Sequence, residues 1–381
     1  AAVGIFIDIG SRDEAPSANG SAHFIEHMLF KRSSKHSAAE LAFEMDAIGG
    51  QINAYTTREN TCFYARVLDT HLNTAINLLS EMFFDCAFDE AETESERGVI
   101  LEEIGMYEDT PDDACYEKLM SGCYKGALGR PVLGKPKTLA KMSGASLKAF
   151  KENHYTASNI VISLCGNYED SHIDHIKELF SGMTKSRRKA TRRAEYGSHI
   201  SVRRKKTEQN QFCLAFPSSS VISDDRFAMS LLSTVLGGGV SSRLFQNIRE
   251  KYGLCYSIFA FQSTFMDTGL LSVATAVNKE TEMRTLGLIG DELKLFVDKG
   301  ISEEELKRAR EQAKSSLVMS LESTNSRMLK MGNSILALGK CLTPDELIAR
   351  YDAVSCEQIL DLARNRIDFS KMSLSALGKT V

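Results

Sequence analysis

Hydrophobic residues recur at two spacings along the chain, and segments with each spacing alternate. Residues 51–57 and 61–68 alternate apolar and polar positions around the polar turn Arg58-Glu59-Asn60, which predicts two strands joined as a hairpin. The next segment, 69–84, has apolar residues at helical spacing: Leu72, Ile76, Leu79 and Phe83. A further helix is predicted over 89–107. The first half of the chain is therefore predicted to contain strands followed by paired helices.

The second half repeats this order. Strands are predicted over 254–262 and 268–276, and helices over 241–251, 281–297 and 302–319. The last helix begins with a capping signal, Ser302-Glu-Glu-Glu305. The repetition indicates an internal duplication. We expect an α+β fold of two duplicated halves, each a mainly antiparallel sheet with helices packed on one face.

Five residues near the start, His23-Phe24-Ile25-Glu26-His27, place two imidazoles four positions apart and a carboxylate beside them. On a helix, side chains at this spacing lie one above the other, so His23 and His27 can bind one metal ion while Glu26 flanks its open position. This order is that of the inverzincins. Taken alone, the motif is also compatible with an amphipathic helix whose histidines cover a core.

A catalytic zinc ion normally takes a third protein ligand, for which Glu103 is the candidate. It ends an acidic stretch, 89–104, with apolar residues at helical spacing, and Glu96 lies two turns earlier on the same face. Glu96 is therefore expected to hold a ligand by a hydrogen bond. A solvated acidic helix face is the alternative that this stretch leaves open.

Composition narrows the class of protein. The 381 residues exceed one ordinary core, and we expect an N-terminal catalytic half at 1–185, a basic linker with a lead-in strand at 186–206, and a second half at 207–381. A formal net charge of −4 and the lack of a long apolar run favour neither nucleic acid nor membrane as a partner. The basic stretch 185–206 is a competing nucleic-acid patch, but it carries few aromatic residues and no recognition motif. Nine cysteines without a Cys-x-x-Cys pair indicate reduced thiols.

Several motifs together carry a resemblance to a known family. They are the His23-x-x-Glu26-His27 motif, the 75 residues between His27 and Glu103, the context Ser95–Ile104, and the segments Gly49–Thr56, Asn153-His154-Tyr155, Asn159–Ser163 and Arg249–Tyr256. With these motifs the chain resembles the pitrilysin/insulinase superfamily of zinc metallopeptidases, in particular its mitochondrial-processing-peptidase-like bacterial members. The resemblance covers most of the chain and favours the metal-binding interpretation of the acidic helix.

The resemblance implies a processing-peptidase/LuxS-like metallohydrolase fold and a zinc-dependent endopeptidase. It implies one Zn²⁺ per chain, held by His23, His27 and Glu103. Glu26 is then the general base on the water at the zinc. Tyr256 and Arg249, both from the second half, are expected to stabilise the oxyanion and to hold the substrate backbone.

The implied substrate is a peptide or an unfolded, presequence-like polypeptide inside a closed chamber. We expect it to pair with the strand that carries Asn53, Ala54 and Tyr55. Asp113 and Glu117, four positions apart, are candidates to receive an arginine near the cut, although this segment is equally a plausible solvated helix start. One chain carries both groups of site residues, so we expect a homodimer.

Two further expectations follow from the resemblance. A non-catalytic scaffold or partner subunit of the same fold is the alternative function, although such proteins generally lose ligands that this chain keeps. Ala1–Gly10 has the pattern of an inner strand, whereas family members carry another strand before it. We therefore expect residues before Ala1 to be missing and a cytoplasmic, bacterial location. One departure from the family pattern is Lys31-Arg32-Ser33-Ser34, directly after the motif.

Overall fold

The computed structural model describes residues 1–186 and 193–379. Within it the chain forms two compact units. Unit 1 comprises Ala1–Ile104, Arg130–Arg192 and Ser320–Cys341, and unit 2 comprises Gly105–Gly129, Arg193–Met319 and Leu342–Val381. Neither unit is continuous in sequence.

Unit 1 is built on a four-stranded antiparallel sheet with the order β2-β3-β1-β4. Its strands are β1 (Ala2–Ile7), β2 (Gln51–Thr56), β3 (Thr61–Arg66) and β4 (Ile160–Cys165). β1 is an inner strand, as its uniformly apolar sequence predicts, because it is buried on both faces. β2 lies at the edge and pairs, among the described residues, on one side only.

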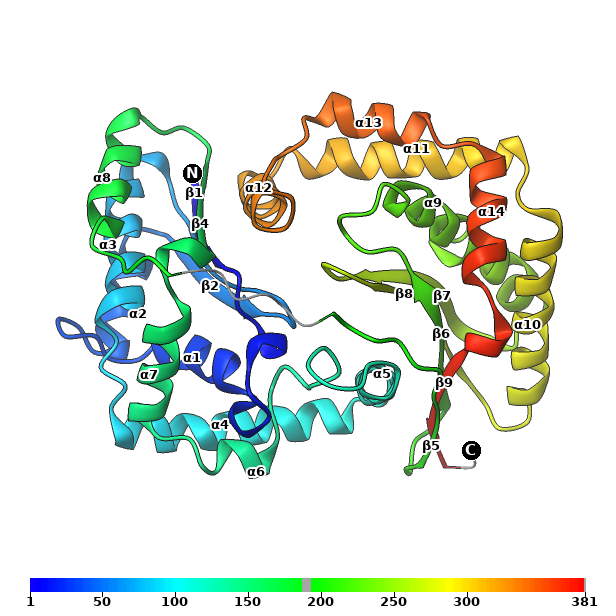
Figure 1. Ribbon diagram of the computed structural model, residues 1–381, viewed down its shortest axis with the longest axis horizontal. Helices are drawn as coiled ribbons and strands as arrows, with labels where there is room; N and C mark the ends of the chain where they lie inside the picture. Colours follow the sequence, from blue (N-terminus) through cyan, green and yellow to red (C-terminus); the bar gives the residue numbers. More distant parts are fainter. Residues whose placement is uncertain (187–192, 380–381) are drawn as a thin grey trace. The chain divides into compact units, whose positions relative to one another are not determined.

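The helices of unit 1 cover both faces of this sheet. They are α1 (Ser21–Leu29), α2 (Ala38–Ala47), α3 (Leu72–Asp85), most of α4 (Glu90–Asp109), α6 (Pro136–Leu139), α7 (Gly144–His154), α8 (Asp170–Phe180) and α12 (Thr324–Leu338). Val3 and Ile5 of β1 face the core that α1 and α3 share, whereas Ala2 and Phe6 face Met328 of α12. Figure 1 shows α3 and α8 on one side of the sheet and α12 on the other.

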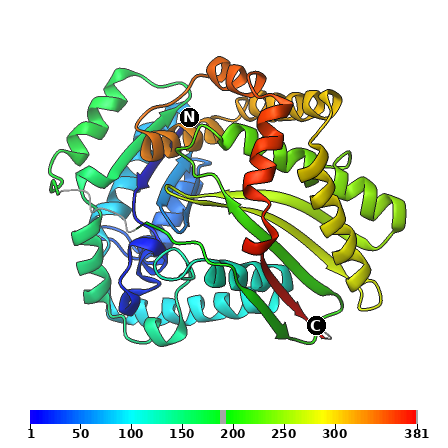
Figure 2. The same cartoon turned by 45° about the vertical axis from the view of Figure 1, so that its right-hand side comes forward.

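Unit 2 repeats this design with one added strand. Its sheet has the order β5-β9-β6-β8-β7, formed by β5 (Ile200–Arg204), β6 (Asn210–Ser218), β7 (Cys255–Thr264), β8 (Gly269–Val277) and β9 (Ser373–Gly378). The order β7-β8-β6-β9 matches β2-β3-β1-β4. β5 is added in parallel beside β9 (Figure 2), and the other pairs are antiparallel. The matching order supports the predicted duplication.

The helices of unit 2 also cover both sheet faces. They are α5 (Pro111–Cys123), α9 (Arg226–Gly237), the π-helix η5 (Phe245–Glu250), α10 (Glu282–Lys299), α11 (Glu303–Ser320), α13 (Pro344–Asp352) and α14 (Cys356–Arg366). Short 3₁₀ turns in the two units are η1 (Ser11–Asp13), η2 (Pro16–Ala18), η3 (Asp69–His71), η4 (Ala157–Asn159) and η6 (Phe369–Lys371). α5 packs Leu119 and Cys123 against Cys213 and Leu377 of the sheet.

The two halves of the sequence thus exchange one helix each. α5 belongs to the first half but packs in unit 2, and α12 belongs to the second half but packs in unit 1. The predicted helices on one face are present, and these exchanged helices cover the second face. The division of the sequence at 186–206 stays a prediction, since the compact units follow packing rather than linear order.

Two residues of the basic stretch between the halves form ion pairs with acidic residues at the end of α4. Arg203 lies 2.6 Å from Glu108, and Lys205 lies 2.9 Å from Asp109. Residues 187–192 of the predicted linker lie outside the described residues. Within the described residues none of the nine cysteines forms a disulfide bond, and seven are buried. Within the described ranges, no helix combines the length and the apolar character that crossing a membrane requires.

Candidate metal centre

Helix α1 is anchored by its apolar face and at its N-terminus. Phe24, Ile25 and Met28 are fully buried, so the helix is fixed against the sheet. Its first N–H groups are satisfied from outside the helix, because the Glu14 carboxylate accepts hydrogen bonds from Gly20 N at 2.7 Å and Ala22 N at 2.8 Å. Burial raises the pKa of Glu14 to about 7, although these hydrogen bonds oppose the rise. The N-terminal anchor fixes the rotation of α1 and therefore the direction of its histidines.

The three predicted metal ligands converge in unit 1. One ligand atom from each of His23, His27 and Glu103 lies within 4.8 Å of the other two. Glu103 Oε2 is 3.6 Å from His23 Nε2 and 3.5 Å from His27 Nε2. The two imidazole rings meet edge to face with centroids 4.7 Å apart. Helices α1 and α4, distant in sequence, therefore present three donor atoms to one point.

These separations fit a tetrahedral zinc ion. Zinc bonds of about 2.0–2.1 Å at tetrahedral angles place neighbouring ligand atoms roughly 3.4 Å apart. The observed 3.5 and 3.6 Å separations need only a small adjustment to reach that value. Two imidazoles and one carboxylate are also a common ligand set for catalytic zinc. The donor set and its spacing therefore fit the metal that the sequence predicts.

The electrostatics of the cluster favour a cation. Burial, and next the neighbouring His27, lower the pKa of His23 to about 4, so its imidazole is neutral, as a metal ligand must be. Burial also lowers the pKa of His27, but hydrogen bonds and charge from Glu103 and Glu96 outweigh it and raise that pKa. The hydrogen bond from His27 lowers the pKa of Glu103. The carboxylates that favour a proton on His27 would equally favour a metal ion.

Glu96 lies behind the cluster and contacts His27. Its Oε2 is 3.0 Å from His27 Nδ1, which leaves His27 Nε2 directed at Glu103. Its Oε1 is 2.5 Å from Lys31 Nζ. In the sequence, Lys31 begins the segment that departs from the family pattern. The structure gives it a contact that fixes Glu96.

Arg97 docks α4 and was not predicted to contribute to the site. Its guanidinium donates to the carbonyl oxygens of Leu139 and Met142, the latter at 2.7 Å. It also lies 5.8 Å from the ring centroid of Phe24 on α1. Its position directly after Glu96 is the signal that would have pointed to it. Arg97 thereby fixes the position of α4 along its axis, and this position determines where Glu103 lies relative to the two histidines.

Glu26, the predicted base, lies next to His27 on helix α1. Its side chain is half-buried, and its buried Oε2 has no hydrogen-bond partner among the described residues. Burial raises its pKa, although a hydrogen bond with Thr56 of β2 opposes the rise. Glu26 is thus one residue from His27 in the sequence and in contact with the end of the edge strand.

The predicted substrate strand is β2. Asn53 Oδ1 accepts a hydrogen bond from Ala54 N at 2.8 Å, so that N–H is used by a side chain. The Tyr55 hydroxyl accepts a hydrogen bond from Asn333 Nδ2 of α12 at 3.0 Å. The side chain of Tyr55 therefore contacts α12, and Tyr55 would contact a peptide through its backbone.

Arg249 and Tyr256 belong to unit 2, and both lie at irregularities of the backbone. Arg249 is in the π-helix η5, and Tyr256 is the residue that a β-bulge between Cys255 and Ser257 leaves unpaired. The guanidinium lies 5.2 Å from the Tyr256 ring centroid, and Tyr256 is 79% exposed. The two predicted residues thus contact each other, with Tyr256 exposed and Arg249 half-buried, and their joint action with unit 1 stays a prediction.

Asp113 and Glu117 also belong to unit 2, on helix α5. The segment is helical, as the prediction of an arginine pocket requires. Asp113 is exposed and near the N-terminus of α5, and partial burial together with Asp112 raises its pKa. This position fits the solvated helix start as well as the pocket, so the pocket stays a prediction.

The sequence is similar to a family of peptidases along most of its length. Residues 1–136 match the family described as insulinase (peptidase family M16), and residues 141–313 match the one described as peptidase M16 inactive domain. An uncharacterized zinc protease of Bacillus subtilis, YmxG, is 42% identical over 95% of this chain and 89% of its own length. An uncharacterized zinc protease of Streptomyces coelicolor is 36% identical over 99% of this chain and 84% of its own.

Two solved structures resemble the fold. A protease from Helicobacter pylori matches with a TM-score of 0.89 and 19% identity, over 99% of this chain and 94% of that one. A peptidase M16 inactive domain from Pseudomonas fluorescens matches with a TM-score of 0.91 and 21% identity, over 100% and 93%. At these identities the likeness shows the fold alone, and it agrees with the predicted α+β class.

Proposed function

Because this chain belongs to the insulinase family of peptidases, family M16, we propose that it is a zinc-dependent endopeptidase acting on peptides or unfolded, presequence-like polypeptides. The observation that carries the proposal is the convergence of His23, His27 and Glu103 beside the buried carboxyl of Glu26. A metal site that served structure alone would be closed by a fourth protein ligand. Among the described residues this cluster has three metal-ligand side chains, which leaves room for a water molecule and a substrate.

His23, His27 and Glu103 would hold one zinc ion, which when bound acidifies a water molecule and polarises the peptide carbonyl. Glu26 accepts a proton at its carboxylate as the water oxygen bonds to the carbonyl carbon. It then returns that proton to the amine nitrogen as the C–N bond breaks. Burial of Glu26 suits this role, because a raised pKa lets the carboxylate both take and release the proton.

The finer parts of the proposal concern the substrate and the assembly. An extended peptide pairs with the open edge of β2 through backbone hydrogen bonds. Tyr256 donates to the developing oxyanion, Arg249 holds the substrate backbone, and Asp113 with Glu117 receive an arginine near the cut. A homodimer enclosing a chamber and a cytoplasmic location complete the proposal. The contact between Arg249 and Tyr256 supports it, since it holds the two side chains together while Tyr256 stays exposed to a ligand.

The decisive experiment compares the protein with its Glu26→Gln variant on a quenched peptide, with metal analysis of both. We expect Glu26→Gln to retain zinc and to lose activity roughly 10²- to 10⁴-fold. Glu102→Gln, an exposed neighbour of Glu103 on α4, is the matched control and should retain activity. Undiminished turnover by Glu26→Gln would remove the proposed base. A wild-type protein that binds zinc without turnover would instead support the non-catalytic scaffold.

A further inference from the structure

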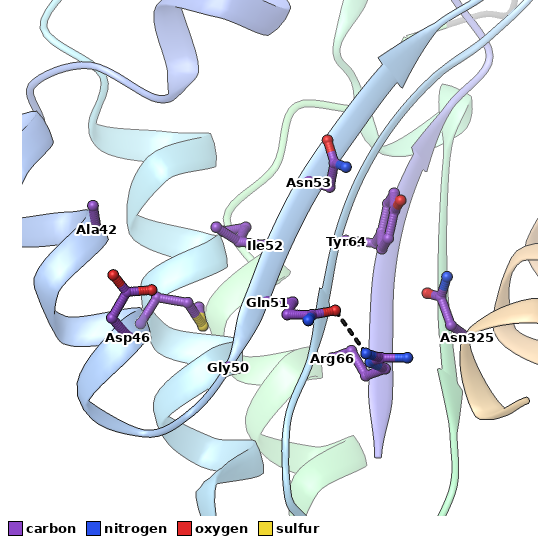
Figure 3. Close-up of a pocket in the computed structure, with 10 residues that line it drawn as sticks. Ala42, Asp46, Gly50, Gln51, Ile52, Asn53, Tyr64, Arg66 and Asn325 are labelled. Atoms are coloured by element: carbon purple, nitrogen blue, oxygen red, sulfur yellow. Dashed lines mark hydrogen bonds between the residues drawn. The ribbon is translucent and has the colours of Figure 1, made fainter.

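A cavity of about 430 Å³ opens beside the start of β2, within unit 1. Gln51 and Asn53 of β2, Tyr64 and Arg66 of β3, Asp46 of α2 and Asn325 of α12 contribute to its lining (Figure 3). None of the four zinc-site residues His23, Glu26, His27 and Glu103 lines it. The cavity therefore belongs to the edge strand rather than to the metal centre.

Strand register brings the polar groups of this cavity onto one face of the sheet. Gln51 lies directly opposite Arg66, and Asn53 lies opposite Tyr64. Arg66 Nη2 donates to Gln51 Oε1 at 2.7 Å, as the dashed line in Figure 3 shows. The guanidinium thus extends over the edge strand, about one strand spacing (~4.8 Å) from the line that an added strand would take.

Arg66 has the chemistry of an anion receptor. Within the ranges 1–186 and 193–379, no carboxylate forms an ion pair with it, and its hydrogen bond goes to a neutral amide. A guanidinium has five donors in a planar fork, which matches a carboxylate. Asn325 adds a side-chain amide to the lining, and the N–H groups at its Nδ2 are of the kind that donate to a carboxylate. Asp46, the carboxylate of the cavity, lies on α2 and apart from the Gln51–Arg66 pair in Figure 3.

The distance along β2 relates this cavity to the cleaved bond. Glu26 hydrogen-bonds Thr56 at one end of β2, and Gln51 is at the other end. Five residues of strand span roughly 16 Å. A peptide that adds antiparallel, the more stable pairing, runs from Thr56 toward Gln51 in its N-to-C direction. Residues about four to five positions after the cleaved bond therefore reach the cavity.

We propose that Arg66, together with Gln51 and Asn325, forms a subsite for a carboxylate located four to five residues after the cleaved bond. The carboxylate is either an acidic side chain or the free C-terminus of a short peptide. This inference rests on the proposed peptidase function and adds a preference that the metal centre cannot supply. The cavity then determines how many residues separate the cleaved bond from the preferred carboxylate.

The first test uses amidated peptides of fixed length in which one Glu moves through positions two to seven after a bond mapped by mass spectrometry, with Gln elsewhere. We expect kcat/KM to rise roughly tenfold with Glu at position four or five. Arg66→Gln should remove the rise, and Arg204→Gln, an exposed arginine on β5, should retain it. A flat profile, a maximum before the bond, or a maximum that persists in Arg66→Gln would overturn the subsite.

The second test distinguishes an acidic side chain from a free C-terminus as the source of the carboxylate. It also tests the subsite separately from the proposed peptidase function. Peptides without acidic residues, ending four or five residues after the bond, are compared as free acid and as amide. Preference for the free acid assigns the C-terminus as a ligand. Fluorescence anisotropy with the Glu26→Gln protein then measures binding of Glu and Gln peptides without turnover. If no peptide is cleaved, the peptidase proposal fails, and the affinities for the Glu and Gln peptides alone decide whether the subsite exists. Equal affinities for the two peptides, or a preference for the Glu peptide that is unchanged when Arg66→Gln is added, would overturn the subsite.

Discussion

Glu96 connects His27, one of the proposed metal ligands, to Lys31. It is 95% buried, accepts from His27 on one oxygen and contacts Lys31 on the other. A carboxylate on the far nitrogen of a ligand histidine sets the ring's tautomer and increases its basicity. The same buried carboxylate needs Lys31, since an unpaired buried charge is costly. The geometry of His27 thus depends on a residue that would not touch the metal.

Replacing Glu96 by Gln should therefore weaken zinc binding by roughly 10- to 100-fold, because the amide lacks the charge that acts on His27. Competition with a chromophoric chelator measures the affinity. Glu92→Gln, four residues earlier on α4 and paired more loosely with Arg32 at 3.6 Å, is the control and should leave affinity unchanged. Equal affinities of wild type and Glu96→Gln would show that Glu96 only packs the helix.

A second residue-scale prediction concerns stability in unit 2. Burial alone would raise the pKa of Glu305, but hydrogen bonds and charge from Arg243, with bonds from Ser302, lower it to about 2. Because the folded pKa lies below the ordinary 4.5, this stabilisation is present above pH 4.5 and disappears as pH falls through about 2. Allowing for partial exposure, Glu305→Gln should lower the free energy of unfolding by about 2 kcal/mol at pH 7.

Urea unfolding between pH 7 and pH 3 measures this difference, which should narrow toward the acid end. Glu304→Gln, an exposed neighbour on α11, provides the control and should change the unfolding free energy little at any pH. A difference between wild type and Glu305→Gln that stays constant down to pH 3 would contradict the ionic origin of the effect.

At the scale of elements, helix α1 depends on the residue that precedes it. Gly20 has φ +103°, and a Cβ there would lie 2.9 Å from Gly134 Cα and 2.9 Å from Leu139 Cδ2. The left-handed backbone and the close approach both require glycine. Together with Glu14, this turn sets where α1 starts and hence where His23 lies.

Gly20→Ala should reduce the free energy of unfolding by roughly 1–3 kcal/mol, because it adds backbone strain and a clash at this turn. Gly98→Ala on α4 is a control of opposite sign: a Cβ there meets nothing within 4 Å, so the change should stabilise by roughly 0.5–1 kcal/mol. Thermal unfolding of both variants measures the pair. Equal shifts for the two glycines would refute the role of the turn.

Periodicity located most elements because their burial is local and regular. The helix predicted over 302–319 is Glu303–Ser320, and the strand predicted over 268–276 is Gly269–Val277. The segment 241–251 was predicted as an ordinary helix, whereas Phe245–Glu250 is π-helical. The bulge at Tyr256 was likewise missed. Each irregularity adds one residue to a turn of helix or to a strand, and the spacing of hydrophobic residues is too coarse to reveal one added residue.

The candidate site divides in the same way. His23, Glu26 and His27 are readable from sequence, since a single helical turn brings them together. The approach of Glu103 depends on how α4 docks through Arg97 on the carbonyls of Leu139 and Met142, a tertiary event. Glu14 was missed because its carboxylate reaches α1 from outside the helix, beyond the usual capping position.

At the scale of the whole molecule, the exchange of α5 and α12 links the folding of the two halves. α12 covers Ala2, Phe6 and Cys62 on the second face of the unit 1 sheet, although it lies more than 100 residues after β4 in the sequence. Gly332 lets α12 approach closely, since a Cβ there would meet the Phe6 ring at 2.2 Å. α5 covers Cys213, Ala215 and Leu377 in unit 2 in the corresponding way. Each half of the sequence therefore leaves one apolar sheet face bare by itself.

Separately produced fragments 1–206 and 207–381 should consequently each expose apolar surface, bind a hydrophobic dye and unfold at lower urea than the intact chain. Mixing them should restore the intact urea midpoint, because α12 then covers β1 and β4 while α5 covers β6 and β9. Dye fluorescence and urea unfolding of the fragments, alone and mixed, measure this. If the restored urea midpoint depends on the contact between α12 and Phe6, mixing should raise the midpoint less when fragment 207–381 carries Gly332→Leu. Gly287→Leu is the control, because a Cβ at Gly287 meets nothing within 4 Å, and it should leave the restored midpoint unchanged. Fragments that each unfold cooperatively at the intact midpoint would mean that the exchanged helices contribute little, and that the halves fold independently despite sharing them.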